Sequence, residues 1–404
     1  MRIDDIKAIY RAAGPRGFPR VIKNMLEGRN SLGEEIPKTP PEKFSLRALW
    51  EATVGRPEET LPSYMSGALN GMELQEANES TSFINATSQL INAKVIEGYT
   101  GVARIGDSLV TTMTSRLRSE RIVGFTSLEG PLEVPEGTAY QESGFTEKYV
   151  TTETAKKGRI IELTEEAIFL DQTGQVLMRA QRIGEMTAQE RERTIIGGIL
   201  DVGSAVPGYK DVWRPSGVAA ALYSAANNNF LATATTLTDW QQIDTVLQYH
   251  AENVRDDRLV VAEREPILWM PRQLLVSRKK LGTASRILSA TQFQSQPGAT
   301  DASAVMISGN PLNSIIPGLS VVSSPLIDYA ANLVGSRYDD SDDWFLGDFP
   351  KQFIWQEIWP ITTVRAQQND EAAFSRDIVA RMKVRYWGGI AAIDNKYVIK
   401  VNGT

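Results

Sequence analysis

The stretch EKYVTTETAKKGRIIELTEEAIFLDQTG, Glu147 to Gly174, changes from strand-like to helix-like sequence within a few residues. A β-branched segment leads into a basic turn that ends at Gly158. Ile161 and Leu163 then alternate with polar residues, a spacing that predicts a half-buried strand. The stretch contains no His, no Cys and no phosphate-binding loop. It therefore indicates a structural junction between strand and helix and not a catalytic motif.

A short helix is predicted directly after this strand. Thr164 can cap its N-terminus, and the two glutamates that follow suit the positive end of the helix dipole. Asp171 and Gly174 interrupt this helix, and Thr173 is a candidate cap for a second one.

The residues from Gln175 to about Leu200 predict a single long helix, about 40 Å in length at about 1.5 Å per residue. Small and apolar residues share one face of this helix: Leu177, Ala180, Gly184, Ala188 and Ile195. Charged residues lie on its other faces: Arg179, Arg182, Glu190 and Arg193. Gly184 costs about 1 kcal/mol relative to Ala inside a helix. We therefore expect another element to pack closely against it.

Two parts of the chain predict appendages. Residues 1–80, which are basic at their start and contain three prolines between Asn30 and Phe44, predict an arm with short helices. Helical spacing follows from Leu74 to Tyr99. The segment from Leu117 to Val150 has β-prone runs separated by glycines and prolines, which predicts a long β-hairpin or extended loop. Such a ribbon is marginally stable in water unless it lies on another surface.

Residues 202–345 predict a mixed α/β region. An amphipathic helix is predicted from Thr238 to Val254, and a second helix is predicted to begin at Pro271. Three strands and one exposed polar loop complete the region: strands at Arg258–Ala262, Pro266–Met270 and Leu319–Ser323, and the loop from after Leu281 to about Gly309.

The C-terminal part predicts β-structure. From Ile378 to Tyr386, apolar residues alternate with largely basic ones, so that one face of the strand is apolar. Lys396–Asn402 predicts a final strand after an Asp-Asn turn.

Composition limits the classes of function. The chain has 404 residues, 42% hydrophobic and 23% charged, as in globular proteins with a sizeable core. The absence of a membrane-length apolar run and of a signal-peptide-like N-terminus predicts folding in the cytoplasm without a membrane partner. Zero cysteines exclude disulfides, thiolate metal sites and Cys nucleophiles. A net charge of −6 argues against a protein whose main task is tight nucleic-acid binding.

No motif of a catalytic centre is present, neither GxxxxGK[ST] nor GxSxG. The acidic cluster from Tyr338 to Trp344 can bind a divalent cation, but it lacks calcium-loop spacing, so a solvated loop is favoured. His250, the single histidine, is interpreted as structural. The basic face formed by Arg381, Lys383 and Arg385 is interpreted as solvated or ion-paired, with nucleic-acid contact as the alternative. We predict no catalytic residue, no metal site and no cofactor.

Two consecutive segments, LEVPEGTAYQES (Leu132–Ser143) and ETAKKGRIIELTEEAIFLDQTG (Glu153–Gly174), resemble the tailed-bacteriophage major capsid proteins of the Hong Kong 97-type fold. Further segments resemble the family in the same order: Arg264–Gly282, Gly309–Asp328, Asp342–Trp355 and Phe374–Asn402. The resemblance covers about residues 75–402, and its specificity comes from the order and spacing of the segments.

The resemblance implies an α+β fold. In the Hong Kong 97-type capsid fold, a peripheral domain holds a long spine helix on a β-sheet, and an axial α/β domain, an extended β-hairpin loop and an N-terminal arm complete the subunit. The implied boundaries are 1–80 for the arm, 81–116, 153–201 and 349–404 for the peripheral domain, 117–152 for the extended loop and 202–348 for the axial domain.

The resemblance also implies a function. It predicts a major capsid protein, not an enzyme, that self-assembles into pentamers and hexamers of an icosahedral shell around double-stranded DNA. Assembly is expected in the host bacterial cytoplasm and the product is the virion. Separate scaffold, portal and decoration proteins are the further partners that the family implies; we expect neither proteolytic maturation nor a covalent cross-link.

Two sets of residues follow as candidates for contacts. The extended loop predicts a subunit interface at Leu132, Val134, Glu136, Gly137, Tyr140 and Phe145. The basic start of the chain predicts nucleic-acid-facing residues at Arg2, Arg11, Arg16 and Arg20.

Two alternatives remain. One is an encapsulin-like compartment shell, which the particle's contents would distinguish. The other is a metal-dependent two-domain α/β enzyme that uses the carboxylates of Tyr338–Trp344, which a metal assay would distinguish.

Overall fold

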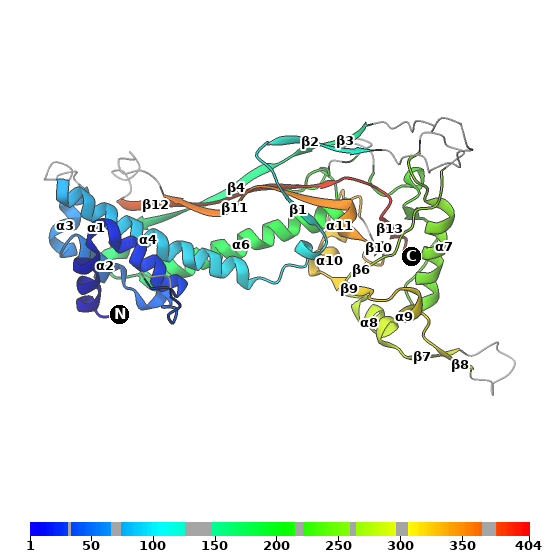
Figure 1. Ribbon diagram of the computed structural model, residues 1–404, viewed down its shortest axis with the longest axis horizontal. Helices are drawn as coiled ribbons and strands as arrows, with labels where there is room; N and C mark the ends of the chain where they lie inside the picture. The colour runs from blue at the N-terminus through cyan, green and yellow to red at the C-terminus, as the bar shows by residue number, and fades with distance from the viewer. Residues whose placement is uncertain are drawn as a thin grey trace, which may run out of the picture. The chain divides into compact units, whose positions relative to one another are not determined.

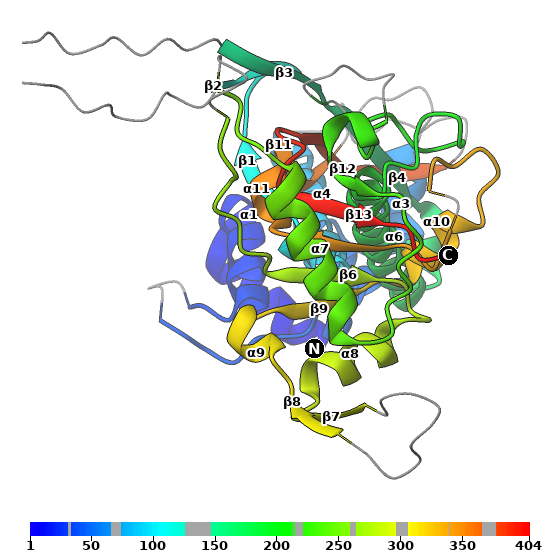
Figure 2. The same ribbon diagram turned by 90° about the vertical axis from the view of Figure 1, so that its right-hand side faces the viewer.

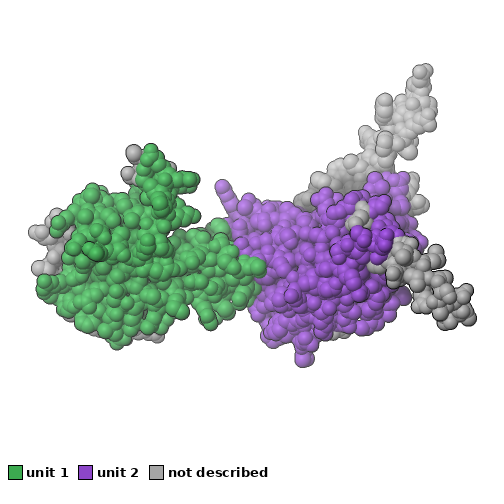
Figure 3. All heavy atoms as spheres, turned by 90° about the horizontal axis from the view of Figure 1, so that it is seen from below, with its two compact units in different colours: residues 1–103, 156–190, 359–387 green, residues 104–155, 191–358, 388–404 purple. Residues whose placement is uncertain are grey.

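A computed structural model describes residues 1–30, 34–65, 74–125, 147–212, 214, 221–258, 264–295, 306–338, 340–365 and 377–404. The chain divides into two compact units (Figure 3). Unit 1 consists of residues 1–103, 156–190 and 359–387, and unit 2 of residues 104–155, 191–358 and 388–404.

Unit 1 combines helices with part of a four-stranded sheet. Its helical elements are α1 (Ile3–Glu27), η1 (Pro41–Lys43), α2 (Leu46–Thr53), α3 (Pro57–Met65), α4 (Leu74–Gly101) and α5 (Glu165–Phe169). Four elements are divided between the two units: β4 (Ala155–Thr164), α6 (Thr173–Ile199), β11 (Phe353–Arg365) and β12 (Ile378–Ala392). The sheet has the order β1-β11-β12-β4, where β1 (Thr111–Thr114) belongs to unit 2.

The core of unit 1 lies between this sheet and the helices, which cover one face of the sheet (Figure 1). Ile161 and Leu163 of β4 and Met382 and Val384 of β12 are buried in it together with apolar residues of α1, α2, α4 and α6. The alternation predicted for both strands is confirmed.

Helix α6 confirms the predicted long helix and its packed face. Its small residues allow a backbone-to-backbone approach by α4: a Cβ atom on Gly184 would lie 2.2 Å from the carbonyl oxygen of Val95, and one on Gly98 would lie 2.2 Å from that of Gln181. Real Cβ atoms do not approach so closely, so glycine at these two positions fixes the distance between the helices.

The N-terminal helices are part of this core. Helix α1 has a break at Gly14, whose φ of 69° is left-handed, and Pro15 starts the next turn. The sequence predicted an arm with short helices here. Instead Ile6, Phe18 and Ile22 are fully buried, because removing such side chains from water stabilises the fold by about 1.5–3 kcal/mol each. The sequence-derived domain boundaries themselves remain predictions.

Unit 2 contains a five-stranded sheet with the order β5-β13-β10-β6-β9. Its strands are β5 (Phe230–Leu231), β13 (Val398–Val401), β10 (Trp344–Gly347), β6 (Gln273–Val276) and β9 (Ser320–Ser323). Helix α7 (Trp240–Asn253), capped by Asp239, lies across one face of this sheet (Figure 2). Its Ile243 and Val246 are buried against the strands. The predicted helix at 238–254 and the strands at 319–323 and 396–402 are confirmed.

The remaining elements of unit 2 are short. They are η3 (Gly106–Ser108), β2 (Ser119–Phe125), β3 (Glu147–Glu153), η4 (Ala225–Asn227), α8 (Leu281–Ser289), β7 (Gln292–Ser295), β8 (Met306–Gly309), α9 (Leu312–Ile315), α10 (Pro325–Ala331) and α11 (Phe349–Gln352).

Three predictions for unit 2 were wrong. The residues after Pro271 form strand β6 and not a helix, because their apolar side chains are buried between β9 and β10. Pro266–Met270 is not a strand but makes one isolated bridge, from Pro266 to Arg255. The region predicted as a loop after Leu281 contains α8 and the β7–β8 hairpin. Residues 259–263 and 296–305 lie outside the described part.

The strand-to-helix junction is built as predicted, except for its caps. Asp171 breaks the chain between α5 and α6 with a φ of 50°. Thr164 precedes α5, but its side chain makes no capping bond. The Thr173 hydroxyl accepts a 2.8 Å hydrogen bond from the amide of Leu46 and donates one of 2.6 Å to Asp171. The junction therefore also fixes the start of α2.

Candidate assembly surfaces

The base of the extended loop is an antiparallel pair, β2 and β3, as the sequence predicted. Its register runs from Ser119 opposite Glu153 to Phe125 opposite Glu147. Gln356 of β11 attaches it: its amide group donates to Glu120 at 3.2 Å and to the carbonyl of Leu117 at 3.3 Å, and its oxygen accepts from Thr152. A buried amide with these partners holds the ribbon on β11 of the four-stranded sheet.

The loop beyond this base lies outside the described residues. The six predicted interface residues, Leu132, Val134, Glu136, Gly137, Tyr140 and Phe145, all belong to residues 126–146. Their role stays a prediction.

The four predicted nucleic-acid-facing residues lie in one helix or directly before it. Arg2 precedes α1, and Arg11, Arg16 and Arg20 lie in it; all four are exposed. The backbone amide of Arg2 donates to Asp5 at 3.1 Å. The structure thus places these arginines on the solvent side of a helix whose apolar side is buried.

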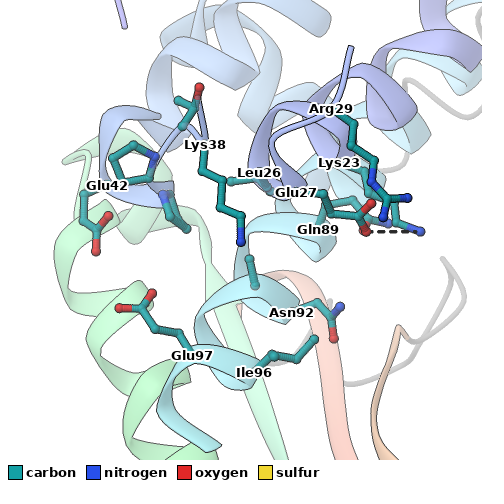
Figure 4. Close-up of a pocket in the computed structure, with 14 residues that line it drawn as sticks. Lys23, Leu26, Glu27, Arg29, Lys38, Glu42, Gln89, Asn92, Ile96 and Glu97 are labelled. Atoms are coloured by element: carbon teal, nitrogen blue, oxygen red, sulfur yellow. Dashed lines mark ion pairs between the residues drawn. The ribbon is translucent and has the colours of Figure 1, made fainter. Parts of the chain in front are cut away.

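A groove of about 690 Å³ runs between α1, the segment that follows it, and α4 (Figure 4). Its floor is apolar, with Leu26, Pro41, Ala93 and Ile96 among its lining residues. Sequence reasoning missed this groove, because its walls come from segments distant in the chain.

Lys94 joins Glu42 and Glu97, two residues that line this groove, and we call these two ion pairs the Lys94 clamp. The Lys94 side chain is only 6% exposed and forms ion pairs with Glu42 and, at 2.8 Å, with Glu97. The hydrogen bond from Lys94 lowers the pKa of Glu42. Burial acts to lower the pKa of Lys94, but the two carboxylates outweigh it and raise that pKa. Both groups therefore stay charged near neutral pH, and the clamp ties η1 to α4.

The basic face of β12 is occupied by partners within unit 1. Arg381 pairs with Glu162 at 2.9 Å. The guanidinium of Arg385 lies 4.2 Å from the ring centre of Trp359, which also makes a T-shaped contact with Trp387. Arg381 and Arg385 are thus ion-paired or stacked; Lys383 is exposed.

The acidic cluster and the histidine also have structural surroundings. Asp343 pairs with Lys400 at 2.8 Å, and Asp342 pairs with Lys280 at 3.4 Å. His250 is buried, stacks on Trp269 with ring centres 4.0 Å apart and contacts the carbonyl of Lys396 at 3.1 Å. Among the described residues, no group of three carboxylates or imidazoles is arranged to bind a metal ion.

The comparison with protein families decides the identity of the chain. Residues 146–401, from the second strand of the ribbon to the last strand, match the model of the phage capsid protein family. The chain belongs to this family. The resemblance to tailed-phage major capsid proteins is thereby confirmed, and so is the α+β class of the fold.

Solved structures similar to this capsid protein have low sequence identity. A structure from Mycobacterium phage Bobi is 14% identical, with a TM-score of 0.43, and covers 74% of this chain and 90% of its own. The capsid of a native GTA particle is 10% identical, with a TM-score of 0.43, and the match covers 74% of this chain and 91% of that chain. A virus-like particle from Pyrococcus furiosus is 8% identical, with a TM-score of 0.40, and the match covers 77% of this chain and 97% of that chain. No significantly similar sequence was found among curated proteins.

The capsid family points to a structural and not a catalytic role for this capsid protein. In the part of the chain that the structure describes, no helix combines the length and apolarity needed to cross a bilayer. The family further implies that many copies assemble into one shell.

Proposed function

We propose that this capsid protein is the major subunit of an icosahedral head that encloses the double-stranded DNA of a tailed bacteriophage or prophage. Its copies form pentamers and hexamers in the host cytoplasm and remain in the virion. The observation that supports the proposal most is the family match, which extends over residues 146–401.

The chain's physical chemistry agrees with assembly. A two-stranded ribbon gains stability only when it lies on another surface. A head-to-tail contact between different surfaces of identical subunits closes into rings. We propose that the six loop residues Leu132, Val134, Glu136, Gly137, Tyr140 and Phe145 form one side of such a contact.

Electron microscopy of the purified protein tests the assembly. Closed shells with five- and sixfold subunit clusters are the expected result. A chain that stays monomeric at every concentration would contradict the proposal.

The contents of the particle test the role of the helix α1 arginines. Arg2, Arg11, Arg16 and Arg20 are proposed to contact phosphates without reading sequence, with a contribution that falls as salt rises. The variant with Gln at Arg11, Arg16 and Arg20 is expected to form shells that retain DNA less well than the wild type as salt increases. The exposed Arg264 on unit 2, changed to Gln, is the control.

Particles that contain protein cargo and no nuclease-protected DNA would instead favour an encapsulin-like compartment. Scaffold, portal and decoration proteins are proposed as separate partners in the phage head.

A further inference from the structure

The groove between α1, the segment that follows it, and α4 carries opposite charges at its two ends. At one end the Lys94 clamp combines two carboxylates with one ammonium group, so this end has a net negative charge. The side chains of Glu42 and Glu97 are each 55% exposed, whereas that of Lys94 is 6% exposed. A ligand in the groove therefore meets the carboxylates and not the ammonium group.

The other end of the groove is basic. Arg29 and Lys38 are exposed there, and neither forms an ion pair within the part of the chain that the structure describes. A third cation, Lys23, has a carboxylate oxygen of Glu27 at 3.6 Å. Figure 4 shows Arg29 on the side away from the two carboxylates of the clamp, with the amino group of Lys38 between them. Two positive charges in this half of the groove are thus left without compensation.

The backbone contacts around Lys38 fix its position at the groove. Gly28 ends α1 with a left-handed φ of 75°, and its carbonyl accepts a 2.8 Å hydrogen bond from the amide of Ile36. The amide of Thr39 donates to the carbonyl of Met25 at 2.9 Å. A Cβ atom on Gly28 would lie 2.7 Å from Cγ of Lys38, so the stem of this lysine passes directly over the glycine. The returning segment is therefore held against the end of α1, and its lysine points toward α4 (Figure 4).

Between its charged ends the groove offers apolar surface and hydrogen-bonding groups. Ile96 is 43% exposed, so a large apolar side chain on the floor is left uncovered. Gln89 and Asn92 lie on the same face of α4 and carry amide groups that both donate and accept. The groove volume of about 690 Å³ is within the range of about 300–1,000 Å³ that is common for ligand sites. An extended peptide matches these features, because its backbone pairs with amides while its side chains reach the floor and the ends.

We propose that this groove binds an extended peptide segment of another protein, in which an apolar side chain lies between an acidic end and a basic end. Arg29 and Lys38 receive the acidic end, and the apolar side chain covers Ile96. The basic end lies against the two carboxylates of the Lys94 clamp. The opposite charges of the groove select the orientation of the peptide. This contact depends neither on shell assembly nor on DNA, so it goes beyond the proposed function.

Fluorescence anisotropy of labelled hexapeptides tests the proposal, with the full chain measured before and after assembly. The dipolar probe has two glutamates at one end, two leucines in the middle and two lysines at the other end, with both termini blocked. Matched probes carry glutamate at both ends or lysine at both ends. The dipolar probe is expected to bind most tightly, with an affinity that falls as salt rises, because the charges lie at the surface.

Changes at Lys38 test the basic half of the groove. Lys38→Gln is expected to weaken binding of the dipolar probe by about two- to fivefold, as for loss of an exposed ion pair. The wild type should prefer the probe with glutamate at both ends to the probe with lysine at both ends, and Lys38→Glu should reverse that preference. The matched control is Lys383→Glu, an exposed lysine on β12, which should leave all three affinities unchanged.

A change on the floor tests the apolar part of the contact. Ala93→Gln places a longer polar side chain on the floor, and glutamine suits a helix. The affinity for the dipolar probe is expected to fall about tenfold, because less apolar surface is covered. Thermal unfolding verifies that the variant is folded, and the Lys38 series decides the question if it is not.

Three results would overturn the inference. They are equal affinities for the three probes, effects of the Lys38 changes no larger than that of Lys383→Glu, and binding that disappears when shells form. The last result would show that a second copy of the chain fills the groove. Electron microscopy of the same samples judges the proposed function separately. Shells without peptide binding leave that function intact, whereas peptide binding by a chain that never forms shells refutes the function and not the inference.

Discussion

The position of a Cβ atom on Gly184 lies 2.2 Å from the carbonyl oxygen of Val95, so α4 and α6 pack at a separation that no larger residue permits. Gly184→Ala is therefore expected to lower the free energy of unfolding by about 1–3 kcal/mol, although Ala favours a helix. Denaturant unfolding of the unassembled subunit measures the difference. Gly174→Ala, where no atom lies within 4 Å of the added carbon, is the control and should be neutral or stabilising. Equal losses at both positions would show that helix packing is not the cause.

The buried ion pair between Arg214 and Asp201 is expected to matter more than any exposed pair. Arg214 donates to both oxygens of Asp201, at 3.0 and 2.9 Å, and Asp201 also accepts from the amide of Leu222 at 2.7 Å. Arg214→Ala leaves the buried carboxylate of Asp201 with only the partly exposed Arg337 as a cationic partner, at 3.2 Å. The free energy of unfolding is therefore expected to fall by about 3 kcal/mol.

The control for that change is Arg118→Ala, which removes an exposed pair with Glu153. Its expected effect is below about 1 kcal/mol. Thermal unfolding of both variants checks the ranking, and a larger effect at Arg118 would contradict it.

The single histidine gives unit 2 a predictable response to acid. Burial lowers the pKa of His250 from 6.5 to about 4, against the effect of its hydrogen bond to Lys396. The folded state therefore binds a proton less readily than the unfolded state. As the pH falls from about 6.5 to about 4, the histidine is protonated in the unfolded state but not in the folded state. The free energy of unfolding therefore decreases over this range, by about 3 kcal/mol in total.

His250→Gln should remove this part of the pH dependence between pH 6.5 and 4. Because the chain contains one histidine, its imidazole signal in NMR reports the pKa without assignment. A measured value near 6.5 would refute the prediction.

Deletion of Gly130–Tyr140 is expected to leave a folded, soluble subunit that forms no stable shells. Strands β2 and β3, which flank the deleted segment, remain anchored by Gln356. Circular dichroism checks the fold and electron microscopy checks assembly. Normal particles from this deletion would remove the loop from the assembly mechanism.

Sequence periodicity correctly predicted the elements that bury one face along their whole length. The small residues of α6 and the alternation in β12 indicate their buried faces directly, because each face contacts one continuous neighbour. Residues after Pro271 were assigned to a helix because proline suits a first helical turn; burial between two strands, which local sequence does not show, decided otherwise.

The surfaces were less predictable than the core. The clamp at Lys94 includes Glu97 three residues along α4, but its second partner, Glu42 of η1, is distant in the chain, so local sequence did not indicate that pair. Likewise, the basic start of the chain and the prolines between Asn30 and Phe44 suggested an arm, but burial of Ile6 and Phe18 holds α1 in the core on both sides of its break at Gly14.

The chain passes from one compact unit to the other five times, after residues 103, 155, 190, 358 and 387. Neither unit is a continuous piece of polypeptide, so a single proteolytic cut cannot release either of them intact. A nick in a surface segment would leave fragments that remain associated, and expression of one half alone would yield a chain that lacks strands of its own sheet.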